Sequence, residues 1–272
     1  MVNGFFPHSL QEALEILSQH SAVPYGGGTD LMVQNKPCEA YLFLRKIPEM
    51  TQIKVDDEYI RIGAAVTFTE ALADARVPQL MKEAVSRIAA PAIRNAGTFG
   101  GNLGNGSAKA DSVLIEFVSD AKLLIKSLNK ERLVEVDKFY LGRKKLDLAA
   151  DELIVEVLLP KNGWDKFYYQ KVGGRNALAI SRVSFAGLFA IEDGRITNIA
   201  SAFGAVADTV LRYKDLENML LGKTLAEAKE LKEEFLKAYN ERMVLTRGRV
   251  SAEYRKTVCM NLLRDFLTQY GI

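Results

Sequence analysis

The stretch IRNAGTFGGNLGNGSAKAD, residues 93–111, decides how this chain is interpreted. Five of its residues are Gly and three are Asn, and hydrophobic periodicity is almost absent from it. A long segment without predicted structure in a compact chain is usually functional or disordered. Disorder is disfavoured because Ile93, Phe99 and Leu103 supply apolar anchors. We therefore predict an ordered loop that wraps a polar ligand, with Asp111 as an acceptor for ribose or sugar-alcohol hydroxyls.

Another glycine-rich stretch, PYGGGTDL at residues 24–31, lies upstream, so in chain order it is the first glycine stretch and residues 93–111 are the second. Three consecutive glycines let the backbone approach a bulky anion and direct several N–H groups at it, and Thr29 adds a hydroxyl donor. The alternative is a flexible turn. Better-known phosphate motifs do not fit: a dinucleotide motif needs Gly where Leu31 stands, and the Gly-Lys-Thr at 222–224 has Glu217 where a P-loop begins with Gly. That second near-match predicts only a helix start.

Composition excludes several classes of function. The 272 residues carry 36 Lys and Arg against 34 Asp and Glu, and this net charge of +2 argues against a general nucleic-acid-binding protein. Only two Cys (Cys38, Cys259) and two His (His8, His20) are present, and none has metal-ligand spacing. We therefore expect no zinc site, iron–sulfur cluster, haem attachment or disulfide scaffold on this chain. Low Cys use favours a reducing compartment, so a cytoplasmic location is expected. Neither a membrane span nor a signal peptide is predicted.

Local patterns predict the secondary structure. Capping boxes at Ser9-x-x-Glu12, Thr67-x-x-Glu70 and Thr224-x-x-Glu227 mark three helix starts. Helices are expected at 10–19, 68–75 and 80–89 and from residue 224 onward. Strands are expected at 23–25, 41–44, 59–66, 122–126, 153–159, 166–172, 182–191 and 195–206, with a hairpin turn at 192–194. This order predicts an α+β protein with a domain junction near Asn162-Gly163.

The two glycine motifs carry a resemblance to a known family. Gly-Gly-Thr-Asp-Leu at 27–31, Ile-Arg-Asn-x-x-Thr-x-Gly-Gly-Asn at 93–102 and Ser-x-x-x-Asp at 107–111 resemble the FAD-binding subunit of molybdenum hydroxylases. This is the family of the xanthine, carbon monoxide and nicotinate dehydrogenase flavoprotein chains. Residues 203–212 and 247–255 resemble two further family segments. The matches run in family order over essentially the whole chain, although Ala108 replaces a usual Pro, which suggests a divergent member.

The resemblance implies a fold and a set of FAD contacts. The fold is a two-subdomain FAD-binding domain of the vanillyl-alcohol-oxidase/PCMH type over 1–162, then a C-terminal domain of antiparallel sheet and helices over 163–272. No catalytic residue and no metal ligand is implied. The implied FAD-binding residues are Pro24, Tyr25, Gly26, Gly27, Gly28, Thr29, Asp30, Leu31, Ala89, Thr98, Phe99, Gly100, Gly101, Asn102, Asn105, Asp111, Leu158 and Lys171.

The resemblance also implies a function. The chain would be an oxidoreductase subunit that passes electrons from iron–sulfur clusters on one partner chain through FAD to NAD⁺ or another acceptor. A molybdopterin-binding large subunit would oxidise the substrate. Two alternatives stay open at this point: a stand-alone FAD oxidoreductase, for which His8 and His20 are poor base candidates, and a non-enzymatic nucleotide-binding module. No nucleic acid is expected as a partner.

Overall fold

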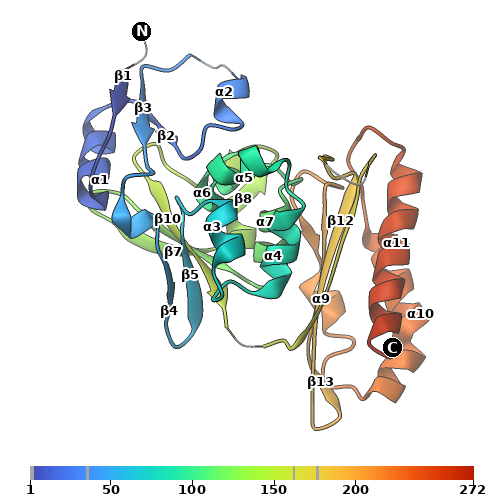
Figure 1. Cartoon of the computed structure of the whole chain (residues 1–272). Helices are drawn as coiled ribbons and strands as arrows, with labels where there is room; N and C mark the ends of the chain where they lie inside the picture. The colour runs from blue at the N-terminus through green and yellow to red at the C-terminus, as the bar shows by residue number, and fades with distance from the viewer. Residues whose placement is uncertain (1–2, 35–36, 162, 176–177) are drawn as a thin grey trace. The chain divides into compact units, whose positions relative to one another are not determined.

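The chain forms two compact units (Figure 1). The computed structural model describes residues 3–34, 37–161, 163–175 and 178–272. The first unit runs from Met1 to Ser107 and from Asp120 to Lys161, and the second takes Ala108–Ser119 and Asn162–Ile272. The junction expected near Asn162-Gly163 lies at one of the crossings between units, with Asn162 itself outside the described residues. No described helix is long and apolar enough to cross a membrane.

A small parallel sheet begins the first unit. Its strands lie in the order β1 (Asn3–Phe5), β3 (Ala40–Phe43) and β2 (Ala22–Tyr25), and both pairings are parallel. The connecting helix α1 (Leu10–Gln19) has the predicted bounds and buries Ala13, Leu14 and Leu17. Ser9 caps it by accepting from the N–H of Glu12. The predicted reciprocal bond is wrong, because the Glu12 carboxylate reaches one residue further and accepts from the N–H of His8 at 2.7 Å. A short helix, α2 (Leu31–Gln34), follows the first glycine stretch.

A larger antiparallel sheet completes the first unit. Its strands lie in the order β4 (Ile53–Val55), β5 (Tyr59–Gly63), β10 (Leu153–Pro160), β6 (Lys122–Lys126) and β7 (Glu131–Glu135). The central strand β10 buries seven of its eight residues, as an apolar strand with both faces covered should. The other elements of this part are η1 (Pro48–Met50), α3 (Phe68–Ala73), α4 (Gln79–Ser86), α8 (Val136–Phe139) and the hairpin of β8 (Tyr140–Gly142) and β9 (Lys145–Leu146).

Much of the second glycine stretch is helical, so its prediction as an ordered loop without regular secondary structure was wrong. It holds most of α5 (Pro91–Ala96) and all of α6 (Phe99–Gly104), and α7 (Asp111–Val118) begins at its last residue. Pro91 starts α5 in the first turn, where a missing N–H costs nothing. Thr98 starts α6 by accepting from the N–H of Gly101 at 3.1 Å. Helices α5 and α6 have six residues each, which is too short to show a hydrophobic period, and this is why the sequence did not predict them.

The second unit is a four-stranded antiparallel sheet with helices on its two faces (Figure 1). The strands are β11 (Lys166–Val172), β12 (Val183–Glu192), β13 (Arg195–Gly204) and β14 (Leu211–Arg212). The predicted hairpin is confirmed, with Asp193 at φ 50° and Gly194 at φ 74° as a two-residue turn suits. Helices α10 (Leu225–Arg242) and α11 (Ala252–Gln269) cover one face and α7 the other, and α9 (Lys214–Glu217) lies against β13. Phe185, Phe203 and Phe266 pack in the core of this unit.

Candidate cofactor site in the first unit

The glycine triplet at 26–28 forms a loop that packs against the second glycine segment. A Cβ added to Gly27 would lie 1.7 Å from the carbonyl oxygen of Ala96, and one added to Gly26 would lie 2.5 Å from the Thr98 hydroxyl. Gly28 adopts φ +68°, a conformation that favours glycine. The triplet is therefore required by the close approach of two backbone segments, which brings both glycine stretches to one place.

The start of α6 is held from the other side by the segment that follows β5. The N–H of Gly100 donates to the carbonyl of Ala64 at 2.8 Å, and the N–H of Phe99 donates to Val66 at 3.2 Å. The Phe99 ring is fully buried and lies 5.3 Å from the ring of Phe68. These contacts fix the position of α6 relative to the larger sheet.

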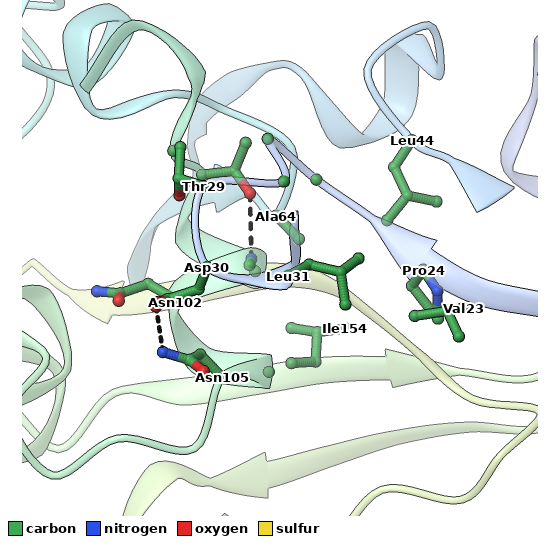
Figure 2. Close-up of a pocket in the computed structure, with 18 of the residues that line it drawn as sticks. Val23, Pro24, Thr29, Asp30, Leu31, Leu44, Ala64, Asn102, Asn105 and Ile154 are labelled. Atoms are coloured by element: carbon green, nitrogen blue, oxygen red, sulfur yellow. Dashed lines mark hydrogen bonds between the residues drawn. The ribbon is translucent and has the colours of Figure 1, made fainter. Parts of the chain in front are cut away.

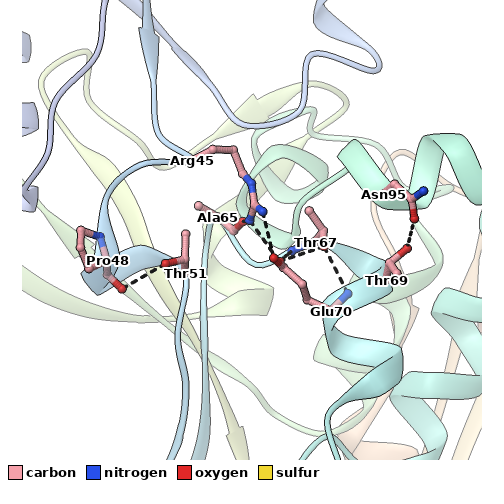
Figure 3. Close-up of polar contacts among 8 residues, drawn as sticks. All are labelled: Arg45, Pro48, Thr51, Ala65, Thr67, Thr69, Glu70 and Asn95. Carbon is pink, nitrogen blue, oxygen red and sulfur yellow. Dashed lines mark hydrogen bonds and ion pairs between the residues drawn. The ribbon is translucent and has the colours of Figure 1, made fainter.

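A cluster of polar contacts joins the two sheets of the first unit (Figure 3). Arg45, just after β3, donates to the carbonyl of Ala65 at 2.6 Å and to both carboxylate oxygens of Glu70 at 2.9 and 3.0 Å. Glu70 also accepts from the N–H of Thr67 at 2.7 Å and completes the predicted capping box of α3. Partial burial acts to raise the pKa of Glu70, but Arg45 and Thr67 outweigh it and hold the pKa below its usual value. The cluster therefore fixes residues 64–67, on which α6 rests.

A cavity of about 440 Å³ opens where the two glycine segments meet, and every residue that lines it belongs to the first unit. Figure 2 shows apolar side chains such as Val23, Leu44 and Ile154 toward one end, and Thr29, Asp30, Asn102 and Asn105 toward the other. The amide of Asn105 donates to the Asp30 carboxylate. A mostly apolar cavity with a few convergent polar groups is the usual form of a small-molecule site.

Twelve of the eighteen predicted site residues line this cavity. They are Pro24, Gly26, Gly27, Gly28, Thr29, Asp30, Leu31, Thr98, Gly100, Gly101, Asn102 and Asn105. Two more lie in the same segments but point elsewhere: the Tyr25 ring packs against Tyr41 and Phe43, and Phe99 is in the core.

Ala89 and Leu158 lie in the first unit but not among the described residues that line the cavity. Ala89 lies with φ 39° in the turn between α4 and α5, and α4 ends at Ser86 rather than at residue 89 as predicted. Its carbonyl and that of Ile88 accept from Arg94 at 2.9 and 2.7 Å, so Arg94 closes a turn. Leu158 is buried in β10, with Arg61 and Lys122 as its neighbours on the adjacent strands.

Asp111 and Lys171 belong to the second unit, where they bind each other. The Lys171 ammonium lies 2.7 Å from the Asp111 carboxylate, and both side chains are less than a tenth exposed. The Ser181 hydroxyl donates to the other carboxylate oxygen at 2.9 Å. Burial raises the pKa of Asp111 although Lys171 and Ser181 act to lower it. The structure thus pairs two residues that the sequence predicted separately.

Twelve further residues line the cavity that the sequence did not single out. They are Val23, Gln34, Leu44, Ala64, Phe68, Gly97, Gly104, Lys144, Leu148, Glu152, Leu153 and Ile154. Only Gly97 and Gly104 had a local signal, since they stand inside the second glycine stretch. Across the described ranges, no three His, Cys, Asp or Glu side chains gather as a metal site.

The cavity fits the chemistry of FAD. Its apolar end can hold a flat heterocyclic ring, while the loop at 26–29 offers backbone N–H groups and the Thr29 hydroxyl to a pyrophosphate. Asp30 and Asn102 can bind sugar-alcohol hydroxyls. Within α6, a Cβ added to Gly104 would meet no atom within 4 Å, so the helix leaves open space beside the cavity.

Comparisons with known proteins agree with this chemistry. A family model described as the FAD binding domain in molybdopterin dehydrogenase matches residues 1–162, and one for the CO dehydrogenase flavoprotein C-terminal domain matches 167–270. The nicotinate dehydrogenase FAD-subunit of Eubacterium barkeri is 30% identical over 97% of this chain and 96% of its own. The xanthine dehydrogenase FAD-binding subunit of Escherichia coli O157:H7 is 31% identical over 77% of this chain and 75% of its own.

The fold has close counterparts among solved structures. A chain of carbon monoxide dehydrogenase from Hydrogenophaga pseudoflava is 25% identical, with a TM-score of 0.88 over 97% of this chain and 95% of its own. The predicted α+β fold, with a FAD-binding domain followed by a C-terminal domain, is thereby confirmed, as is FAD as the cofactor. The chain belongs to the family of FAD-binding subunits of molybdopterin-dependent dehydrogenases, and it is an oxidoreductase subunit.

Proposed function

We propose that this chain is the electron-transfer subunit of a multi-subunit molybdenum hydroxylase. Bound FAD would supply the redox chemistry, taking electrons from iron–sulfur clusters on a partner chain and delivering them to NAD⁺ or another acceptor. The observation that carries the proposal is the cavity built by the two glycine segments, in a chain whose relatives are named as FAD or medium subunits. The role of the protein is then to bind and orient the cofactor.

Different residues of the cavity would bind different parts of FAD. The loop at 26–29 would hold the pyrophosphate with backbone N–H groups, because glycine lets the backbone come close to an anion. Val23, Leu44 and Ile154 would pack on a flat ring, for which apolar contact is the main source of affinity. Asn102, which is half-buried in α6 and lines the cavity, would bind hydroxyl groups. The twelve predicted residues that line the cavity are the proposed FAD contacts.

Other parts of the proposal rest on the family resemblance. They are FAD contacts from Tyr25, Ala89, Phe99, Asp111, Leu158 and Lys171, and a functional division into residues 1–162 and 163–272. An iron–sulfur subunit and a molybdopterin-binding large subunit are the proposed partners, and names such as medium subunit among the relatives support an assembly of several chains. The low Cys content supports a cytoplasmic location.

Flavin binding by the isolated chain tests the cofactor part. The chain is expressed alone, supplied with FAD and examined by its visible spectrum after gel filtration. We expect a yellow protein with one FAD per chain. A colourless protein that binds only other nucleotides would favour the nucleotide-binding module, and a flavoprotein that oxidises a small substrate without partners would favour the stand-alone oxidoreductase.

The composition of the native complex tests the electron-transfer part. A tagged chain is purified from its own host, and iron, acid-labile sulfide and molybdenum are measured with the co-purifying chains. We expect all three in fixed ratio to FAD, and flavin bleaching on addition of the substrate of the complex. A chain that purifies with FAD but without iron and molybdenum would contradict the proposal.

A further inference from the structure

The hairpin of β8 and β9 places a lysine at the cavity. Lys144 stands in its turn with φ +58°, a conformation that few residues other than glycine, asparagine and aspartate adopt. The hairpin packs on the end of α6: the Tyr140 hydroxyl donates to the Leu103 carbonyl at 3.3 Å, and a Cβ added to Gly106 would lie 3.1 Å from the Cα of Lys144. The turn therefore sets the lysine side chain beside the second glycine segment.

Asn105 holds the ammonium group of Lys144 at the polar end of the cavity. The ammonium donates to both the backbone carbonyl and the side-chain oxygen of Asn105, the latter at 2.6 Å. The same side-chain oxygen accepts from Gln34 at 3.2 Å, while its amide group donates to Asp30. Asn105 thus binds a cation from the hairpin and an acid from the first glycine stretch beside the cavity.

The charges around the cavity point to the role of this lysine. Among the described residues, Lys144 is the only Lys or Arg that lines it, and the acids that do so are Asp30 and Glu152. Glu152 already binds Arg132 through both carboxylate oxygens at 2.8 Å. A pyrophosphate brings two negative charges into this site, and backbone N–H groups alone provide only partial positive charge. A nearby ammonium is the group that can compensate a full charge.

We propose that Lys144 binds the pyrophosphate of the cofactor and thereby makes the site selective for nucleoside diphosphates. The inference rests on the proposed FAD site and adds a residue that the glycine motifs do not contain. Asn105 acts as a positioning residue that keeps the ammonium at the end of α6. An unfavourable backbone conformation at Lys144 is then maintained because its side chain is needed at that place.

Two neighbouring lysines provide a matched test. Lys144→Met and Lys145→Met each remove one charge from the same hairpin, but Lys145 is not among the described cavity residues. FAD affinity is measured by quenching of flavin fluorescence in the isolated chain at low and high NaCl, with thermal unfolding as a check on folding. ADP and adenosine are then competed against FAD. Lys144→Arg serves as the variant that keeps the charge.

The expected loss of affinity is confined to Lys144, to ligands that carry phosphate and to low salt. Lys144→Met should weaken FAD and ADP binding by about tenfold at low salt and leave adenosine unchanged, because a charged hydrogen bond to phosphate is lost. The loss should shrink at high salt, which screens exposed charges, and Lys144→Arg should bind FAD within about threefold of the natural chain. Lys145→Met should change little.

Other outcomes overturn the inference. An equal loss of FAD affinity in Lys144→Met and Lys145→Met would mean that only the net charge of the hairpin matters. A loss of affinity that does not depend on salt, or that also affects adenosine, would mean that Lys144 only maintains the structure. No change in Lys144→Met would also refute it. Failure of the natural chain to bind FAD would instead overturn the proposed function itself, so the two failures are distinguishable.

Discussion

At Gly27 an added Cβ would lie 1.7 Å from a backbone oxygen, whereas at Gly104 it would meet no atom within 4 Å. Both glycines line the same cavity. The first allows two backbone segments to touch, and the second leaves room beside them. Glycines in one cofactor motif can therefore be required for two different reasons. Some are needed so that the site can fold, and others leave room for the cofactor, and the sequence alone does not distinguish the two kinds.

Gly27→Ala should have the largest effect, because the methyl group meets the carbonyl of Ala96 and no side-chain rotation can relieve the contact. We expect a loss of about 3–5 kcal/mol in the free energy of unfolding and loss of FAD binding. Urea unfolding and flavin fluorescence measure the two. If the free energy of unfolding of the variant lay within about 1 kcal/mol of that of the natural chain, the two segments could move apart, and Gly27 would not be required for folding.

Gly104→Leu should separate space from folding. The side chain projects into the open region beside the cavity, so we expect FAD affinity to fall by about a hundredfold with unfolding free energy nearly unchanged. Gly104→Ala is the control: it should gain about 0.5–1 kcal/mol of stability in the helix and keep most FAD affinity. Retention of full FAD affinity by the Leu variant would place the cofactor away from Gly104. Gly101 is a less clean position, since its Cβ would lie 2.9 Å from the Thr98 hydroxyl.

The same comparison explains what sequence could predict. The residues at 26–31 and 98–102 were found because runs of Gly are a strong local signal, and every strand from β10 to β13 was expected because long apolar runs define it. The short helix α6 was missed because six residues carry no period. Lys144, Glu152 and Ala64 were missed for another reason: they reach the cavity only through tertiary contacts between distant segments, and nothing in their own neighbourhood marks them.

Arg45→Met tests whether the position of the second glycine segment depends on the polar cluster around Arg45. Loss of the bonds to Glu70 and Ala65 should free residues 64–67 and lower FAD affinity several-fold, with about 1–2 kcal/mol of stability lost. Arg76→Met is the matched control, since it breaks another Arg–carboxylate pair, with Asp74, away from the cavity. Equal FAD affinity in the two variants would show that the Arg45 cluster does not position the site.

The pH dependence of the Arg45 effect has a definite sign. The pKa of Glu70 is lowered in the folded chain, so its contribution is present above its ordinary pKa and is lost as the pH falls through the folded value. The stability difference between Arg45→Met and the natural chain should therefore be full at pH 7 and shrink below about pH 4. A difference that stays constant into acid would mean that arginine packing, not the ion pair, supports residues 64–67.

Thr98→Val should have the smallest effect and addresses the point where the two glycine segments touch. The Thr98 hydroxyl caps α6 through the N–H of Gly101, so its loss should cost about 1 kcal/mol, and Thr98→Ser should restore most of it. Valine is β-branched like threonine and keeps the outline that faces Gly26, so the loop should stay in place and FAD affinity should change by less than about threefold. If Thr98→Val instead abolished FAD binding at unchanged stability, the hydroxyl would be the part of Thr98 that contacts the cofactor. The glycines around it would then serve to expose that hydroxyl rather than to bring two backbones together.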